Sequence, residues 1–284
     1  MSILSQINKI FTISKEQSQI NNHQITGLFV GGAVGEALGL PVVDKTPEQL
    51  QKNPVTELLG FGDYQTPSGT FSMCTEASLE FANFLLDNSM QLITSKRLFA
   101  LCNSWYLYKI KDEEFRLRKL LPISLVAGVV YSKLKQLSMD QIIELLPDLV
   151  CDSAIASASV FFNISKNISF GNSLEDSLKK SKNKTAKLCK DIGLIINNTN
   201  ISLKLIDNVS ECLINEDNYE KITLKSVNLG FYPDLSGFLT GSLSGLKYTY
   251  ENIPIFWKNS ISNIDKIKTI SDKIFELPPE EIIM

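Results

Sequence analysis

The stretch GLFVGGAVGEALGLPVV at positions 27–43 carries a glycine at every fourth position: Gly27, Gly31, Gly35 and Gly39. On an α-helix, residues four apart share one face, so these glycines form a smooth stripe that another backbone can approach closely. A second stripe stands near the end of the chain and consists of Gly237, Gly241 and Gly245. We therefore predict that both segments are helices and that they pack tightly against each other near the centre of the protein.

The first of these segments could be mistaken for a membrane span. Ile25 to Val43 is nearly as long as the roughly 20 apolar residues that a bilayer requires, and Glu36 is its one charged residue. However, Pro41 lies within it and no cluster of lysine or arginine flanks it. These features favour a buried helix of a soluble protein.

The helical period also dominates elsewhere, with apolar residues recurring at spacings of three and four. It predicts helices over 77–86, 98–108, 123–134, 139–146, 154–164, 203–213 and 235–248. The alternation of apolar and polar residues that is typical of strands is absent. We expect an all-α fold with a single compact multi-helix domain over residues 23–284, preceded by an N-terminal extension over residues 1–22.

Composition excludes several classes of protein. The 284 residues are 44% hydrophobic and carry 28 basic and 31 acidic side chains, so the net charge of -3 favours neither nucleic acid nor an anionic membrane. The single histidine, His23, rules out a histidine-rich zinc site, and a Ser-His-Asp triad unless His23 belongs to it. Five scattered cysteines without a CxxC pair indicate a reducing compartment, and the N-terminus lacks an apolar signal-peptide core, so we expect a cytoplasmic protein.

Four blocks of sequence resemble the ADP-ribosylglycohydrolase family, which includes dinitrogenase reductase-activating glycohydrolase and a lens crystallin. GLFVGGAVGEALGLPVV (27–43) matches the spacing of the opening motif, G-x-x-x-G-x-x-x-G-D-A-x-G-x-P-x-E. GTFSMCTEASL (69–79) stands where the family has G-x-W-T-D-D-T-x-x-x-L. GFYPDLSGFLTGSLSG (230–245) resembles the G-D-x-D-T helix, and NIPIFW (252–257) resembles the I-P-x-x-W that follows it. The resemblance implies an all-helical fold.

The resemblance also implies two magnesium ions, held by a Thr-Asp-Asp run and an Asp-x-Asp-Thr run, which orient ribose hydroxyls and activate water for attack on a glycosidic carbon. In this chain the first run falls on Ser72, Met73 and Cys74. The second falls on Tyr232, Pro233, Asp234 and Leu235. The glutamate of the opening motif falls on Val43, and its Asp becomes Glu36.

Of the five acids that the resemblance leads us to expect in metal binding or catalysis, only Asp234 remains, whereas Glu36 keeps a carboxylate at the position of the opening motif's Asp. Magnesium prefers about six oxygen ligands in octahedral geometry, and neither thioether nor thiol suits it. We therefore expect the metal site to be lost, with no metal and no other cofactor bound.

The first functional hypothesis is a catalytically impaired ADP-ribosylglycohydrolase-like protein, a pseudoenzyme that acts as a binding or regulatory module. Its partner would be an ADP-ribose-like small molecule or a protein connected with ADP-ribosylation. The alternative is an active hydrolase that removes ADP-ribose from proteins with a relocated acid site, drawn from Glu36, Asp44, Asp63 and Asp234. A third hypothesis is a purely structural protein without ligand or turnover.

Several of these residues also have simpler interpretations. Asp234 suits the N-cap of the following helix as well as it suits a ligand-binding carboxylate. Glu36, in an apolar run, needs a buried partner, and a structural hydrogen bond is a commoner role for it than catalysis. Met73 and Cys74 are more typical of core filling than of a soft-metal pair. The lysine-rich run at 179–190 could be a docking surface, but a solvated helix face is the commoner structure.

Overall fold

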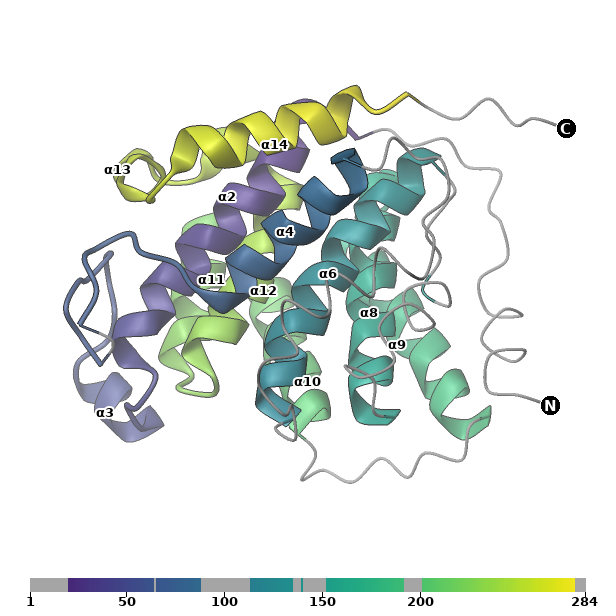
Figure 1. The fold of residues 1–284 in the computed structure, drawn as a ribbon. Coiled ribbons are helices and arrows are strands. Elements are labelled where there is room, and N and C mark those ends of the chain that lie inside the picture. Colours follow the sequence, from purple (N-terminus) through teal and green to yellow (C-terminus); the bar gives the residue numbers. More distant parts are fainter. Residues whose placement is uncertain are drawn as a thin grey trace, which may run out of the picture. The chain divides into compact units, whose positions relative to one another are not determined.

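The computed structural model describes residues 20–63, 65–87, 113–134, 139, 152–191 and 201–278. Within these residues all the regular secondary structure is helical and there is no strand, so the all-α prediction is confirmed (Figure 1). Contacts between Cα atoms divide the chain into two compact units. One comprises residues 20–79 and 204–276, and the described part of the other lies mainly within residues 80–203. Each is considered by itself.

The unit formed by residues 20–79 and 204–276 joins two segments that are far apart in the sequence into one bundle. Its elements are α2 (Asn22–Gly39), η1 (Leu40–Val42), α3 (Pro47–Lys52), the start of α4 (Met73–Asp87), most of α10 (Ile201–Asn215), α11 (Tyr219–Asn228), α12 (Pro233–Tyr248), η3 (Tyr250–Asn252), α13 (Ile255–Ser260) and α14 (Ile264–Glu276). All four sequence blocks that carry the family resemblance lie in this unit.

The two glycine stripes meet in an antiparallel contact between α2 and α12, which we call the glycine seam. An added Cβ at Gly27 would lie 2.1 Å from the carbonyl oxygen of Gly245, and one at Gly35 would lie 1.9 Å from that of Gly237. Real Cβ atoms do not come within such distances of a backbone oxygen, so the helices can approach this closely only because neither has side chains at the seam. The predicted tight packing is confirmed.

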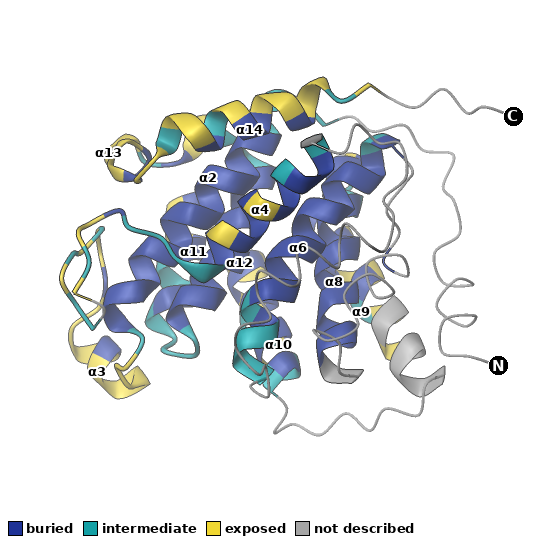
Figure 2. Cartoon of the chain, in the orientation of Figure 1, coloured by how far each residue is buried: buried dark blue, intermediate teal, exposed yellow. Residues whose placement is uncertain are grey.

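Helix α2 is almost completely enclosed within this unit. Every residue from Ile25 to Gly39 is buried (Figure 2). The segment Asn22–Val42 is long and apolar enough to cross a membrane, but all of its apolar window is buried inside the protein, as predicted. The helix begins at a capping box, in which Asn21 accepts a hydrogen bond from the backbone of Gln24 and the Gln24 side chain bonds back to Asn21.

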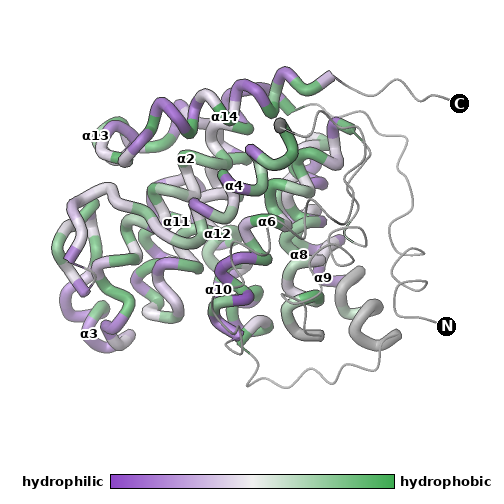
Figure 3. The backbone as a smooth tube through the Cα atoms, in the orientation of Figure 1, coloured by the Kyte–Doolittle hydropathy of each residue, from purple (hydrophilic) through white to green (hydrophobic). Residues whose placement is uncertain are grey.

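Helix α14 covers one side of α2 with an amphipathic face (Figures 1 and 3). Ile267, Ile270 and Ile274 recur at spacings of three and four and are buried, while charged residues such as Lys266 and Lys273 face outward. This pattern is the ordinary one for a helix at the surface of a bundle.

The described part of the other unit consists mainly of α6 (Glu113–Leu134), α8 (Asp152–Ser169) and α9 (Leu174–Asp191). Helices α6 and α8 pack against each other. Tyr131 and Phe162 make an edge-to-face contact with ring centroids 5.6 Å apart, and the buried Lys166 lies over both rings. The lysine-rich run begins within α9, where Lys179 and Lys180 are exposed.

The predicted helices correspond to α4, α6, α8, α10 and α12, each of which extends beyond the predicted bounds. The segments 98–108 and 139–146 lie outside the described residues, apart from residue 139, and so does nearly all of the N-terminal extension. Among the described residues, the helical period did not predict α3, α11, α13 or α14, and α9 was expected only through the solvated helix face at 179–190. The connecting stretch around residues 44–53 contains α3, and α11, α13 and α14 follow later in the chain. Helices α3 and α13 have six residues each, too few to display a clear helical period.

Candidate functional site

The glycine seam brings the C-terminal end of α2 next to the N-terminal end of α12. An added Cβ at Gly39 would lie 2.2 Å from the carbonyl oxygen of Pro233 and 2.4 Å from the backbone nitrogen of Asp234. The residues that replace the family's second acid run therefore stand beside the end of the opening motif. This junction, together with the start of α4, is where the sequence predicted the former metal site.

Glu36 lies at the centre of this region and is completely buried. Its Oε1 accepts hydrogen bonds from the hydroxyl of Ser72 at 3.2 Å and from the backbone nitrogen of Cys74 at 2.9 Å. Its Oε2 accepts two more, from the backbone nitrogen of Thr75 at 2.9 Å and from the Thr75 hydroxyl at 2.6 Å. The prediction that Glu36 makes a buried structural hydrogen bond is thus confirmed, and its carboxyl group accepts four of them.

Two opposing effects act on the pKa of Glu36. Burial, the larger one, raises the pKa above its ordinary value because it disfavours the charged form, and the nearby charge of Asp234 raises it further. The hydrogen bonds from Thr75 and Cys74 lower it, because they stabilise the carboxylate. The net result is a raised pKa.

Asp234 is 2% exposed and stands in the first turn of α12. The prediction that it caps this helix is wrong. The N-cap is Tyr232, whose φ of 47° places it in the left-handed region, and Pro233 occupies the first helical position, where its missing N–H costs nothing. The helix therefore begins two residues earlier than predicted, and Asp234 lies inside it.

The other positions onto which the resemblance maps the metal ligands offer few oxygen atoms. Cys74 is fully buried, and Met73 and Ser72 are partly buried at the beginning of α4. Leu235 is buried in α12, and the ring of Tyr232 makes an edge-to-face contact with Phe231 at 4.9 Å between centroids. Ser72 retains a hydroxyl, but that hydroxyl donates to Glu36.

Asp44 and Asp63 belong to a second group of contacts, between the end of η1 and the loop that precedes α4. The carboxylate of Asp63 accepts a hydrogen bond from the backbone nitrogen of Asp44 at 3.0 Å and pairs with Lys45 at 3.3 Å. The Asp63 side chain is 15% exposed, and Asp44 is exposed. These contacts fasten the loop to η1, so the structure assigns Asp63 an anchoring role. Of the four acids predicted for a relocated site, the structure thus brings Glu36 close to Asp234 and places Asp44 and Asp63 in a separate group.

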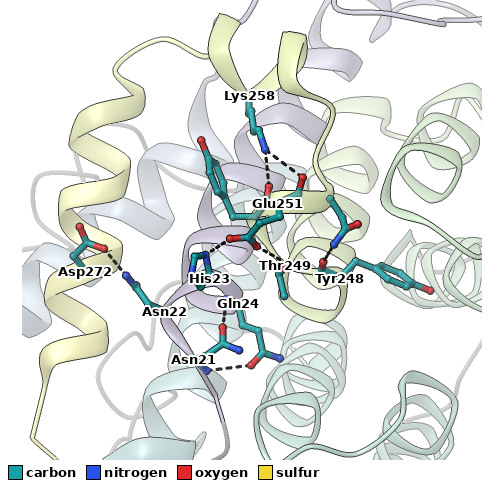
Figure 4. A network of polar contacts seen from close by, with 11 residues as sticks. Asn21, Asn22, His23, Gln24, Tyr248, Thr249, Glu251, Lys258 and Asp272 are labelled. Carbon is teal, nitrogen blue, oxygen red and sulfur yellow. Dashed lines mark hydrogen bonds and ion pairs between the residues drawn. The ribbon is translucent and has the colours of Figure 1, made fainter.

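His23 lies on the surface, near the start of α2 (Figure 4). Its Nδ1 contacts a carboxylate oxygen of Glu251, whose other oxygen accepts a hydrogen bond from Thr249 at 2.6 Å. In the same network Lys258 donates to the carbonyl oxygens of Tyr250 and Glu251. The side chain of His23 is 67% exposed, so it stands apart from the buried acids.

The residues present do not fit a pair of magnesium ions. Among the described residues, no three or more histidine, cysteine, aspartate or glutamate side chains lie together in a way that could hold a metal ion. A carboxylate offers about four acceptor positions, and those of Glu36 are already used by protein donors. The thiol and thioether at positions 74 and 73 are soft ligands, which a hard cation does not favour.

Sequence reasoning missed two residues that the structure makes important. Thr75 supplies two of the four hydrogen bonds to Glu36, and a threonine at the start of a predicted helix is a recognisable signal for such a role. Tyr219 is completely buried in α11 and donates a hydrogen bond to the carbonyl oxygen of Gly31 at 2.8 Å, beside the seam. No pattern in the sequence pointed to it.

Comparisons with known proteins bear on the sequence and the fold. Residues 17–124 match the family model described as ADP-ribosylglycohydrolase. A 67-residue stretch is 33% identical to ADP-ribosylarginine hydrolase Tri1 of Serratia proteamaculans (strain 568) and covers 24% of this chain and 18% of that protein. A solved structure of an ADP-ribosylglycohydrolase-related protein complex shares the fold, with a TM-score of 0.63 at 15% identity over 90% of this chain and 98% of that one.

The fold is therefore that of the all-helical ADP-ribosylglycohydrolases. The resemblance carried by the four sequence blocks is supported by the family model over residues 17–124, which is less than half of the chain, and by the shared fold.

Proposed function

We propose that this protein is a binding or regulatory module of the ADP-ribosylglycohydrolase family that does not perform metal-dependent hydrolysis. Its ligand would be an ADP-ribose-type molecule or a protein connected with ADP-ribosylation. The observation that carries the proposal is the state of Glu36, whose carboxylate is fully engaged by Ser72, Cys74 and Thr75. An acid in that state has no acceptor position left for an ion or for a catalytic water.

The retained framework supports ligand binding as the remaining activity. The glycine seam keeps the ends of α2 and α12 together, although four of the five acids implied by the resemblance are replaced. The curated relative from Serratia is described as a hydrolase of ADP-ribosylarginine, which suggests the ligand class but transfers no activity to this chain. A framework kept without its catalytic acids is the pattern expected of a binding protein.

Calorimetry on the full chain tests the proposal. ADP-ribose is titrated in EDTA and again in excess magnesium, and magnesium is titrated alone. We expect ADP-ribose to bind with the same affinity in both buffers and magnesium alone to give no heat of specific binding. Tight binding of two metal equivalents, or magnesium-dependent release of ADP-ribose from modified peptides, would contradict the proposal.

One observation favours the active-hydrolase alternative. Asp234 is retained and is close enough to Glu36 to raise its pKa, and two neighbouring buried acids are a common arrangement in catalytic sites. Turnover of ADP-ribosyl-arginine or ADP-ribosyl-serine peptides that disappears in Asp234→Asn would establish this function. If the protein neither bound ADP-ribose nor showed turnover at high protein concentration, the purely structural hypothesis would be favoured instead.

A further inference from the structure

The first turn of α4, like that of every helix, has backbone N–H groups that need hydrogen-bond acceptors from outside the helix. The first backbone N–H groups of a helix have no partner within the helix, and a side chain at the N-cap usually accepts from the second or third of them. The N-cap of α4 is Ser72, since its carbonyl oxygen accepts the first intrahelical bond, from the nitrogen of Glu76 at 3.0 Å. Its hydroxyl, however, donates to Glu36 rather than accepting from the helix.

Glu36 takes over the role that Ser72 leaves unfilled. It accepts from the nitrogens of Cys74 and Thr75, which are the second and third residues of α4. It comes from α2, 38 residues earlier in the chain than Cys74. A full negative charge at a helix N-terminus is also favoured by the helix dipole. The cap is thus supplied by another helix.

The same turn is where the resemblance places the first acid run of the metal site. Met73 and Cys74 replace its two carboxylates, so any charge that this turn faces must come from elsewhere. We propose that Glu36 is an internal cap that closes the start of α4 and keeps it folded without bound ions. This inference rests on the proposed function, because it explains how the site can lack metal and remain ordered.

Amide hydrogen exchange of the full chain is the most direct test, because it reports on single N–H groups. Helix first-turn amides usually exchange quickly, whereas those of Cys74 and Thr75 should be protected to the level of amides in the middle of α4. In Glu36→Gln, protection at these two positions should fall by at least tenfold more than protection along α12. Magnesium or EDTA should change neither pattern.

Glu76→Gln is the matched control. Glu76 is an exposed acid in the same first turn, so its substitution removes one negative charge near the same helix end without touching the four hydrogen bonds. It should leave the protection of Cys74 and Thr75 unchanged. An equal loss of protection in both variants would mean that general electrostatics, rather than the cap, orders this turn, and would overturn the inference.

If Glu36→Gln does not fold, a second pair of variants tests the cap from the side of its donor Thr75. Thr75→Val removes one hydroxyl donor to Glu36 and Thr75→Ser keeps it. We expect Thr75→Val to lower the unfolding temperature by several degrees and Thr75→Ser to lower it less. Equal effects would contradict the inference.

The effect of magnesium on stability and on amide exchange is the result that could overturn the inference. If magnesium raised the unfolding temperature of the wild type and slowed exchange at Cys74, Glu36 would be an ion ligand and the inference would fail. Calorimetry with ADP-ribose on the same samples separates this from the proposed function. Lost ligand binding with an intact cap would refute only the function, and a magnesium-dependent cap with ADP-ribose binding unaffected by EDTA would refute only the inference.

Discussion

The glycine seam and the start of α4 lie in the same unit and come from the same set of family motifs, yet they differ in how much of the motif survives. At the seam, glycines stand at all the positions where the motifs have them: Gly27, Gly31, Gly35 and Gly39 on α2, and Gly241 and Gly245 on α12. At the start of α4, Met73 and Cys74 stand where the resemblance places two acids. The seam requires the absence of side chains, which no other residue can imitate. The start of α4 requires hydrogen-bond acceptors, which a carboxyl group on a neighbouring helix can supply.

The largest effect is expected from substitutions at the seam. In Gly35→Ala the new methyl group would lie 1.9 Å from the carbonyl oxygen of Gly237, and in Gly237→Ala it would lie 2.3 Å from that of Gly35. Two rigid backbones would have to separate. We expect each variant to lose about 3 kcal/mol or more of unfolding free energy, the upper part of the range for overpacking. Urea unfolding of the full chain measures this loss.

Gly32→Ala is the control for the seam. Gly32 lies on the same helix, but a Cβ there would meet side-chain atoms of Ser242 and Phe238 rather than backbone. Side chains can shift, so the loss should be clearly smaller than that of Gly35→Ala. If Gly32→Ala were equally costly, the sensitivity would belong to the whole of α2 and not to the backbone contact.

The second effect concerns Glu36 and depends on pH. Because its folded pKa is raised above the unfolded value, Glu36 contributes stability that is fully present below the unfolded pKa and is lost as pH rises through the folded pKa. Glu36→Gln does not titrate and leaves some of the donors from Cys74 and Thr75 without an acceptor. We expect it to cost about 1–3 kcal/mol in acid and progressively less at higher pH.

Parallel denaturant titrations of the wild type and Glu36→Gln between about pH 4 and pH 8 give this difference, in which the titration of most other acids cancels. Asp234 on α12 is the charged group that couples to Glu36, so Asp234→Asn should move the transition to lower pH. A wild-type advantage that grows with pH would show that the hydrogen bonds outweigh burial.

This comparison also shows what the sequence could reveal. The seam follows from a four-residue glycine period, a local pattern that directly encodes one helix face. The cap at α4 joins Glu36 to Thr75 across an intervening loop, and no periodicity links residues so far apart in the chain. The start of α12 was misjudged for a local reason. Asp followed by Leu and Ser is typical of an N-cap, but Tyr232 adopts a left-handed conformation and Pro233 begins the helix.

A smaller effect is expected at Tyr219, which joins α11 to the seam. Its hydroxyl donates to the carbonyl oxygen of Gly31, and burial raises its pKa well above the ordinary value, so it remains protonated. In Tyr219→Phe the ring still fills its place and one buried hydrogen bond is lost. The expected cost is about 1 kcal/mol, measured by urea unfolding. A cost as large as that of Gly35→Ala would mean that this bond, rather than the absence of side chains, holds the seam.

The smallest effect is expected at the N-terminal end of α2, where His23 contacts Glu251 at the surface. Exposed ion pairs contribute little, because water screens the charges and the side chains lose freedom. His23→Gln should therefore change the unfolding free energy by no more than about 0.5 kcal/mol, and added salt should reduce the change further. The capping box of Asn21 and Gln24 is untouched by this substitution and continues to fix the helix start. A loss above about 1 kcal/mol that persists in high salt would instead show that α2 is held at this end by its polar network as much as by the seam.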